Sequence, residues 1–212
     1  YPILDVDERT RGKTKKILNK NKIKVRIGIL NNEALDFYKS YFLSRRKSAL
    51  PFVDAKIAIS KDFYSVNKKK KWITNEQSRS KVHLIRSRYD CILSTYKSVN
   101  KDNSKLDCRI KGLEHLSPAR VIIDRNHKLK KKLDLFKSSK KIKTYVVIGK
   151  KNITKKNFLK KKNIKIIKMY NNNKYLPYEK ILLKLKRMGF TRILCESGFK
   201  TTNSLIKKKL IY

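Results

Sequence analysis

Residues 177–198, PYEKILLKLKRMGFTRILCESG, decide the fold. From Tyr178 to Met188 the apolar residues recur at spacings of three and four, the period of an amphipathic helix. Pro177 stands where a helix starts and Gly189 where one ends. The run Arg192 to Cys195 then has the length and composition of a buried strand. A helix followed at once by a buried strand is typical of a parallel α/β sheet.

The same alternation extends toward the amino terminus. Helical periodicity predicts helices over Asn31 to Arg45 and Thr74 to Arg88, the second with Thr74 and Gln77 at capping-box spacing. The further predicted strands are Ile23 to Leu30, Val53 to Ile59, Cys91 to Thr95, Arg120 to Ile123, Thr144 to Ile148 and Ile164 to Met169. We therefore predict an α/β fold with a largely parallel sheet. Ligands of such sheets bind at the carboxyl ends of the strands, so we expect the site in the loops after Ile59, Thr95, Ile123 and Cys195.

The charge admits two interpretations. Lysine and arginine number 57 against 16 aspartates and glutamates, a net charge of +41. One interpretation is a basic nucleic-acid-binding protein without enzymatic activity, because clustered cations displace phosphate counterions. The other is compositional drift, since asparagine far outnumbers alanine and the lysines form scattered short runs instead of one stripe. We favour drift and expect no specific nucleic-acid partner.

Cys91, Cys108 and Cys195 lie far apart, without the spacing of a zinc site or of a disulfide framework. We expect buried thiols, a reducing cytoplasmic location and no metal. No apolar stretch is long enough to cross a bilayer, so we expect no membrane partner. The chain begins at Tyr1 and stops within an apolar run, and we interpret it as a fragment.

Single motifs do not decide the function. The chain has no G-x-G-x-x-G fingerprint and no P-loop, and its three histidines are scattered. Lys56 falls within an apolar strand pattern, where an ammonium group needs a partner or an exposed edge. Glu196 follows a strand and precedes Ser197-Gly198, a typical ligand-facing loop.

In combination, many short pieces resemble the reductase domain of the riboflavin biosynthesis bifunctional deaminase–reductase family. The resemblance covers Pro51 to Tyr212. The pieces, in order, are Pro51-Phe52-Val53, Lys56-x-Ala58-x-Ser60-x-Asp62, Trp72-Ile73-Thr74, His83-Leu84-x-Arg86, Asp90-x-Ile92-Leu93, Ser98-x-x-x-Asp102, Leu106-x-x-Arg109, Pro118-x-Arg120-Val121-x-x-Asp124 and Cys195-Glu196-Ser197-Gly198.

The first fifty residues resemble the tail of the deaminase domain that precedes the reductase in this family. We expect residues 1–46 to be a remnant of that cytidine-deaminase-like domain with its linker, and residues 47–212 to be the reductase domain, truncated at its carboxyl end. The family's zinc motif belongs to the absent deaminase part, so the resemblance implies no zinc here and a zinc-dependent deaminase in the parent protein.

The resemblance implies a dihydrofolate-reductase-like fold, with a mostly parallel central sheet and helices on both faces. It implies NADPH-dependent reduction of 5-amino-6-(5-phosphoribosylamino)uracil to the ribitylamino compound, by hydride transfer to the ribose C1. It also implies homo-oligomeric association. A relative that binds this substrate but has lost catalysis is a further alternative, which the presence of both Lys56 and Glu196 disfavours.

The resemblance also assigns roles by position. Lys56 would polarise the ribose as the catalytic residue, and Glu196 would accept the pyrimidine N–H groups. The other expected substrate-binding residues are Lys70, Arg86, Leu106 and Arg109, of which the two arginines would bind the phosphate and the adjoining chain. The expected cofactor-binding residues are Ala58, Trp72, Ser98, Asp102, Arg125, Gly198, Phe199, Lys200 and Thr201.

Overall fold

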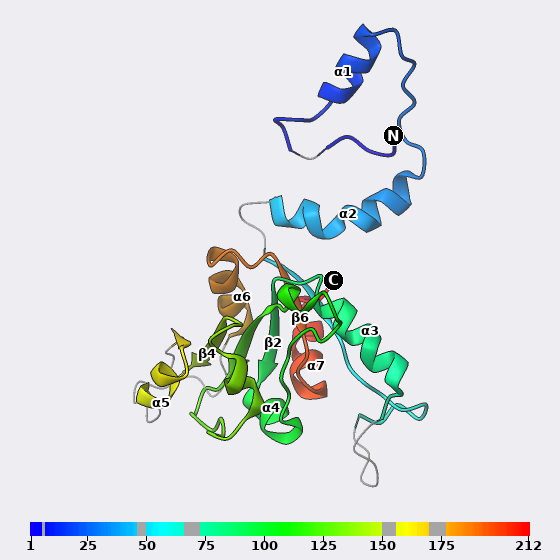
Figure 1. The fold of residues 1–212 in the computed structure, drawn as a ribbon. Coiled ribbons are helices and arrows are strands. Elements are labelled where there is room, and N and C mark those ends of the chain that lie inside the picture. The colour runs from blue at the N-terminus through cyan, green and yellow to red at the C-terminus, as the bar shows by residue number, and fades with distance from the viewer. Residues whose placement is uncertain (6, 46–49, 66–72, 150–155, 170–176) are drawn as a thin grey trace.

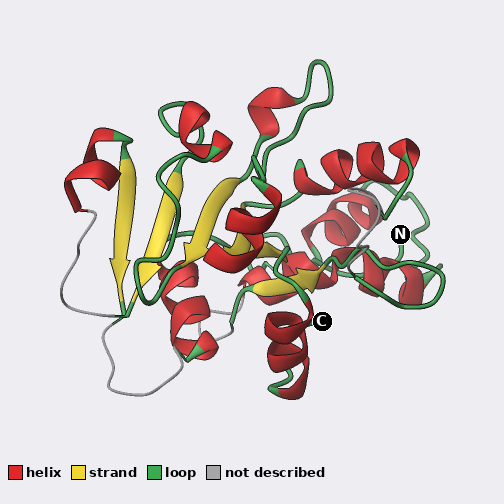
Figure 2. Ribbon diagram, turned by 90° about the horizontal axis from the view of Figure 1, so that it is seen from below, coloured by secondary structure: helices red, strands yellow, loops and turns green. Residues whose placement is uncertain are grey.

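The computed structural model describes residues 1–5, 7–45, 50–65, 73–149, 156–169 and 177–212. Its centre is a six-stranded sheet in the order β1-β6-β2-β3-β4-β5, in which all five strand pairs are parallel. The strands are β1 (Phe52–Ala55), β2 (Cys91–Thr95), β3 (Ala119–Ile123), β4 (Thr144–Ile148), β5 (Ile164–Lys168) and β6 (Arg192–Cys195). Figure 2 shows the strands fanning across the domain. The predicted α/β class is confirmed, and the parallel arrangement extends to every strand of the sheet.

Helices cover both faces of the sheet, as the dihydrofolate-reductase-like fold requires (Figure 1). Side chains alternate across each strand, so both faces of a parallel sheet carry apolar residues that need a cover. One face packs on α6 (Tyr178–Arg187) and α7 (Phe199–Lys207), which contribute Ile181, Leu185 and Leu205. The opposite face is covered by α3 (Glu76–Arg86), α4 (Tyr96–Asp102), the 3-10 helix η2 (Asp134–Ser138) and α5 (Lys156–Lys161).

The amino-terminal part holds α1 (Lys13–Lys20) and α2 (Asn31–Arg45), and α2 contacts β1. The bounds of α2 agree with the prediction. The strand predicted over Ile23 to Leu30 is wrong, because these residues form no ladder. The Gly28 N–H donates to the carbonyls of Tyr1 and Pro2, and the apolar side chain of Ile23 stays 52% exposed. An alternating pattern makes a strand only where a neighbouring strand accepts its hydrogen bonds.

Other boundaries differ slightly from prediction. Strand β1 ends at Ala55 instead of reaching Ile59. Helix α3 begins at Glu76, where the Asn75 side chain accepts a hydrogen bond from the Ser78 N–H, so the predicted capping box at Thr74 is wrong. The short helices α4, α5 and α7, and the 3-10 helix η1 (Glu114–Leu116), were not predicted.

Candidate active site

The carboxyl ends of β1 and β6 bring Lys56 and Glu196 together. The two strands are parallel neighbours with Ala55 opposite Cys195, so the next residue of each strand leaves the sheet at the same edge. The Lys56 N–H donates to the Cys195 carbonyl at 3.0 Å. Glu196 is fixed from the other side, because its N–H donates to the Leu93 carbonyl at 2.9 Å and its carbonyl accepts from the Ser94 hydroxyl at 2.7 Å.

The Glu196 carboxylate binds two cations. Arg86, on the last turn of α3, donates from Nε to Oε1 at 2.7 Å and from Nη2 to Oε2 at 3.0 Å. This two-point geometry is the strongest that an arginine and a carboxylate make. The Lys56 Nζ lies 3.3 Å from Oε2. The side chains of Glu196 and Arg86 are 8% and 11% exposed, and that of Lys56 is 29% exposed, so Lys56 is the member of this triad that a ligand can reach.

Both cations influence the titration of Glu196. Burial alone would raise the pKa of the carboxyl group, but the hydrogen bonds and charge of Arg86, followed by those of Lys56, lower this pKa below its ordinary value. Glu196 is therefore a carboxylate at neutral pH, able to accept hydrogen bonds but not to donate one.

The lowered pKa predicts a pH dependence of stability. A carboxyl group with a depressed folded-state pKa stabilises the protein fully above its unfolded-state pKa, here 4.5, and loses that contribution as the pH falls through the lower folded value. We expect the difference in urea midpoint between wild type and Glu196→Gln to be largest at neutral pH and to shrink below about pH 4.5. A difference that stays constant down to the acid transition of the wild type would contradict the lowered pKa.

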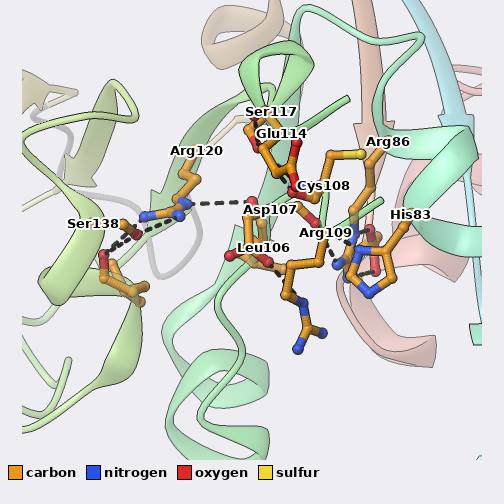
Figure 3. A network of polar contacts seen from close by, with 12 residues as sticks. His83, Arg86, Leu106, Asp107, Cys108, Arg109, Glu114, Ser117, Arg120 and Ser138 are labelled. Atoms are coloured by element: carbon orange, nitrogen blue, oxygen red, sulfur yellow. Dashed lines mark hydrogen bonds and ion pairs between the residues drawn. The ribbon is translucent and has the colours of Figure 1, made fainter. Parts of the chain in front are cut away.

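A second cluster surrounds Asp107, in the loop before β3 (Figure 3). Its backbone carbonyl accepts from Arg86 Nη1 at 3.0 Å and contacts His83 Nδ1 at 2.9 Å. Its carboxylate Oδ1 lies 3.3 Å from Arg109 Nε. Because a carbonyl only accepts, His83 must carry its proton on Nδ1. Burial is the main cause that lowers the pKa of His83, with the charges of Arg86 and Arg109 adding to it, so the ring is neutral at pH 7.

The loops after β2 and β6 meet at the same edge of the sheet. The Ser98 hydroxyl lies 4.0 Å from the point that a Cβ on Gly198 would occupy, and 3.3 Å from the Thr95 hydroxyl. Gly198 is the residue before α7, and no side chain caps that helix. The first N–H groups of an uncapped helix suit a phosphate. The residues present therefore fit a phosphate-bearing cofactor, with Phe199, Lys200 and Thr201 forming the first turn.

The remaining predicted cofactor residues lie nearby or outside the described part. Arg125 follows β3, where the Asp124 carboxylate fixes the loop by accepting from the N–H groups of Lys128 and Leu129. Ala58 lies three residues beyond β1, and Asp102 is the exposed last residue of α4. The predicted contacts of Lys70 and Trp72 fall outside the described residues.

Two further residues lie at the site, although neither was predicted to bind substrate or cofactor. Asp107 lies between Leu106 and Arg109, both predicted to bind substrate, and it joins Arg109 to Arg86 and His83. The position of Asp107 inside a recognised motif was the available signal. His83 lies one turn before Arg86 on the same helix, so i to i+3 spacing could have placed it at the site. The predicted phosphate contact of Arg86 stays a prediction, because its Nε and Nη2 bind Glu196.

These features define a class of protein: a dihydrofolate-reductase-like α/β domain with a charged site at the carboxyl edge of its parallel sheet. The chain belongs to the family described as the RibD C-terminal domain, whose profile matches residues 51–211.

Within the described ranges, no helix is long and apolar enough to cross a membrane, and no three His, Cys, Asp or Glu residues gather as a metal site.

Named relatives share this similarity. The chain is 29% identical over 223 residues to the riboflavin biosynthesis protein RibD of Buchnera aphidicola subsp. Baizongia pistaciae, covering 98% of this chain and 58% of that protein. It is 28% identical to the 5-amino-6-(5-phosphoribosylamino)uracil reductase of Buchnera aphidicola subsp. Acyrthosiphon pisum, covering 67% of this chain and 73% of that one. The solved structure of a diaminohydroxyphosphoribosylaminopyrimidine deaminase/5-amino-6-(5-phosphoribosylamino)uracil reductase from Thermotoga maritima superposes with a TM-score of 0.74 at 24% identity, over 97% of this chain and 55% of that one. The chain thus spans little more than half of its bifunctional relatives.

Proposed function

We propose that residues 47–212 reduce 5-amino-6-(5-phosphoribosylamino)uracil to the ribitylamino compound with NADPH. The observation that carries this proposal is the triad of Lys56, Glu196 and Arg86 at the carboxyl edge of the sheet, in a chain of the RibD C-terminal domain family. A relative with 28% identity is named for this reductase activity. In this proposal the catalytic residue is Lys56, the one member of the triad with substantial exposure.

Glu196 and Lys56 have different roles in this proposal, one in binding the pyrimidine and the other at the ribose. The Glu196 carboxylate accepts N–H groups of the pyrimidine, because its lowered pKa keeps it ionised and acceptor-only. Lys56 is held against Glu196 by one contact, which leaves ammonium protons for the ribose oxygen on which charge builds. Fixing both ends of the substrate aligns the ribose C1 for reduction.

NADPH, when bound, supplies the hydride that reduces the ribose C1. The residues that would hold it are the hydroxyl of Ser98, the backbone around Gly198, the first turn of α7 and Arg125. The uncapped start of α7 suits a phosphate, and the Ser98 hydroxyl lies within van der Waals distance of the point that a Cβ on Gly198 would occupy.

The anionic end of the substrate is assigned to Arg109, with the backbone of Leu106 beside it. Arg109 is 56% exposed, and its Nε is turned toward Asp107. An arginine held by Nε presents its outer pair of nitrogens to an oxyanion. Arg86 contributes through Glu196 in this arrangement, and it would bind phosphate only with an Nη group.

NADPH oxidation by the full-length protein tests the function directly. We expect substrate-dependent loss of NADPH absorbance, and NADPH binding that persists at salt concentrations which abolish binding of mixed-sequence DNA. The lysines are dispersed, so DNA contacts should be electrostatic and should weaken steeply with salt. DNA binding that survives high salt in a protein without NADPH binding would favour the nucleic-acid alternative instead.

We further propose that residues 1–46 belong to a preceding deaminase-like domain whose zinc site lies outside this chain, and that the protein forms homo-oligomers in a reducing cytoplasm. The start of the family match at residue 51 supports the first of these proposals, and the buried free thiols of Cys91, Cys108 and Cys195 support a reducing compartment. Homo-oligomerisation rests on the family resemblance alone. The boundary at residues 46 and 47 falls outside the described residues.

A further inference from the structure

Arg120 is a fully buried arginine behind the substrate side of the site. It is the second residue of β3, with 0% exposure. Its guanidinium donates from Nε to the Leu106 carbonyl at 3.3 Å, from Nη1 to the Leu135 carbonyl at 2.8 Å and from Nη2 to the Ser138 hydroxyl at 2.8 Å (Figure 3). All three acceptors are uncharged.

Burial of the Arg120 guanidinium lowers the stability of the folded protein. Within the part of the chain that the structure describes, no carboxylate forms an ion pair with Arg120, and burial lowers its pKa to about 10. The negative charge of Asp107 offsets part of this lowering, but Asp107 does not pair with Arg120 directly. A buried charge without a directly paired carboxylate costs free energy that an apolar side chain of similar size would not. Packing alone therefore does not explain an arginine at this position.

The feature that Arg120 holds is an unusual turn. Leu106 has a φ of 52°, in the left-handed region that side chains other than glycine rarely adopt. Its side chain is 3% exposed and packs in the core on the same face of the sheet. A strained conformation persists only where its surroundings fix it. Here the core fixes the Leu106 side chain and Arg120 fixes its carbonyl.

The turn determines where the next residues point. Asp107 follows directly, and its carbonyl is bound by Arg86 while its carboxylate binds Arg109. The Nε of Arg109 contacts the Asp107 carboxylate, and Figure 3 shows the rest of its guanidinium directed away from the other labelled residues. The loop is thus held between two buried arginines, Arg120 on one side and Arg86 on the other, and Arg109 is the member left open to a ligand.

We propose that Arg120 is a positioning residue for the anionic end of the substrate: it locks the left-handed turn at Leu106 and so directs Arg109 toward the phosphate. This inference rests on the proposed reductase function. Arg120 itself touches neither substrate nor cofactor in this proposal, and acts only through the loop.

The test uses Arg120→Lys in the full-length protein, since lysine keeps the charge but lacks the three-point fork of the guanidinium. We expect KM for the phosphorylated substrate to rise about 10-fold, within the range of coupled residues. KM for NADPH, and KM for the same substrate without its phosphate, should change less than about 2-fold. In combination with Arg109→Ala, the two effects should be less than additive, because both act on the same contact.

A residue that only stabilises the fold would produce a different pattern. Equal KM changes for both substrates, or full additivity with Arg109→Ala, would overturn the positioning role.

If Arg120→Lys does not fold, Ser138→Ala provides the test, because it removes one hydrogen bond of Arg120. Its matched control is Ser139→Ala, whose hydroxyl bonds the carbonyls of Phe136 and Lys162 instead. A rise in KM confined to Ser138→Ala and to the phosphorylated substrate supports the role, and no difference from the control rejects it. A wild type without turnover would reject the reductase function itself, whereas turnover with uniform losses rejects only this role.

Discussion

Lys56→Met should lower kcat by about 100-fold or more, the scale on which loss of one preorganised donor acts. The physical reason is the position of Nζ, 3.3 Å from the Glu196 carboxylate and partly open to a ligand. Methionine keeps most of the side-chain volume but removes the ammonium protons that would stabilise charge on the ribose oxygen. NADPH affinity should stay nearly unchanged. Steady-state kinetics and a separate NADPH titration measure the two quantities.

Lys61→Met is the matched control, because Lys61 lies in the exposed segment beyond β1. It should leave kcat within about 2-fold of the wild type, since isolated surface charges contribute little. A Lys56→Met enzyme with wild-type kcat would show that Lys56 is a surface lysine and would remove the catalytic residue from the proposal.

Glu196→Gln should raise KM for the pyrimidine substrate more than it lowers kcat. A carboxylate that accepts N–H groups acts in both the ground state and the transition state, so its loss appears mainly as weaker binding. Loss of a charged hydrogen bond costs about 1.5–3 kcal/mol, or roughly 10- to 150-fold in KM. The structure adds a second consequence, because the glutamine leaves Arg86 without a countercharge in a buried place.

Stability and binding must therefore be separated by measuring the melting temperature beside the kinetics. Glu179→Gln is a suitable control, since Glu179 also pairs with a lysine, Lys208 at 2.8 Å, but on the surface. We expect it to change neither KM nor kcat. A Glu196→Gln variant that loses kcat while KM stays constant would contradict a binding role for Glu196.

The buried strands could be predicted from the sequence because their apolar runs have the length of strands and are rich in β-branched residues. Strands β2 and β4 are predicted to the residue, and their side chains are buried on both faces of the sheet. Helix α7 was missed because Phe199–Lys207 contains β-branched threonines of low helix propensity, and tertiary packing of Thr202 and Leu205 outweighs that preference. The strand predicted over Ile23 to Leu30 is wrong for the opposite reason, since its alternating pattern is present but no neighbouring strand lies beside it among the described residues.

The candidate site could be predicted in part. Glu196 follows a predicted strand, and the rule for the carboxyl ends of parallel strands places it at the site. Lys56 was predicted inside the strand over Val53 to Ile59, and only the end of β1 at Ala55 brings it to the same edge. The pairing of Arg86 with Glu196 could not be predicted, because it joins residues 110 positions apart through tertiary packing. The turn at Leu106 likewise depends on Arg120, from a different element, and no local pattern encodes it.

The place of β6 between β1 and β2 bears on the biosynthesis of the enzyme. During translation β1 and β2 leave the ribosome long before Cys195 does. The sheet between these two strands therefore cannot form until β6, which lies between them, has been synthesised. Nascent chains interrupted before that point would carry Lys56 and Arg86 without the carboxylate that pairs with both. A chain interrupted before β6 would also leave the facing edges of β1 and β2 unpaired, and such edges make incomplete products targets for chaperones and proteases.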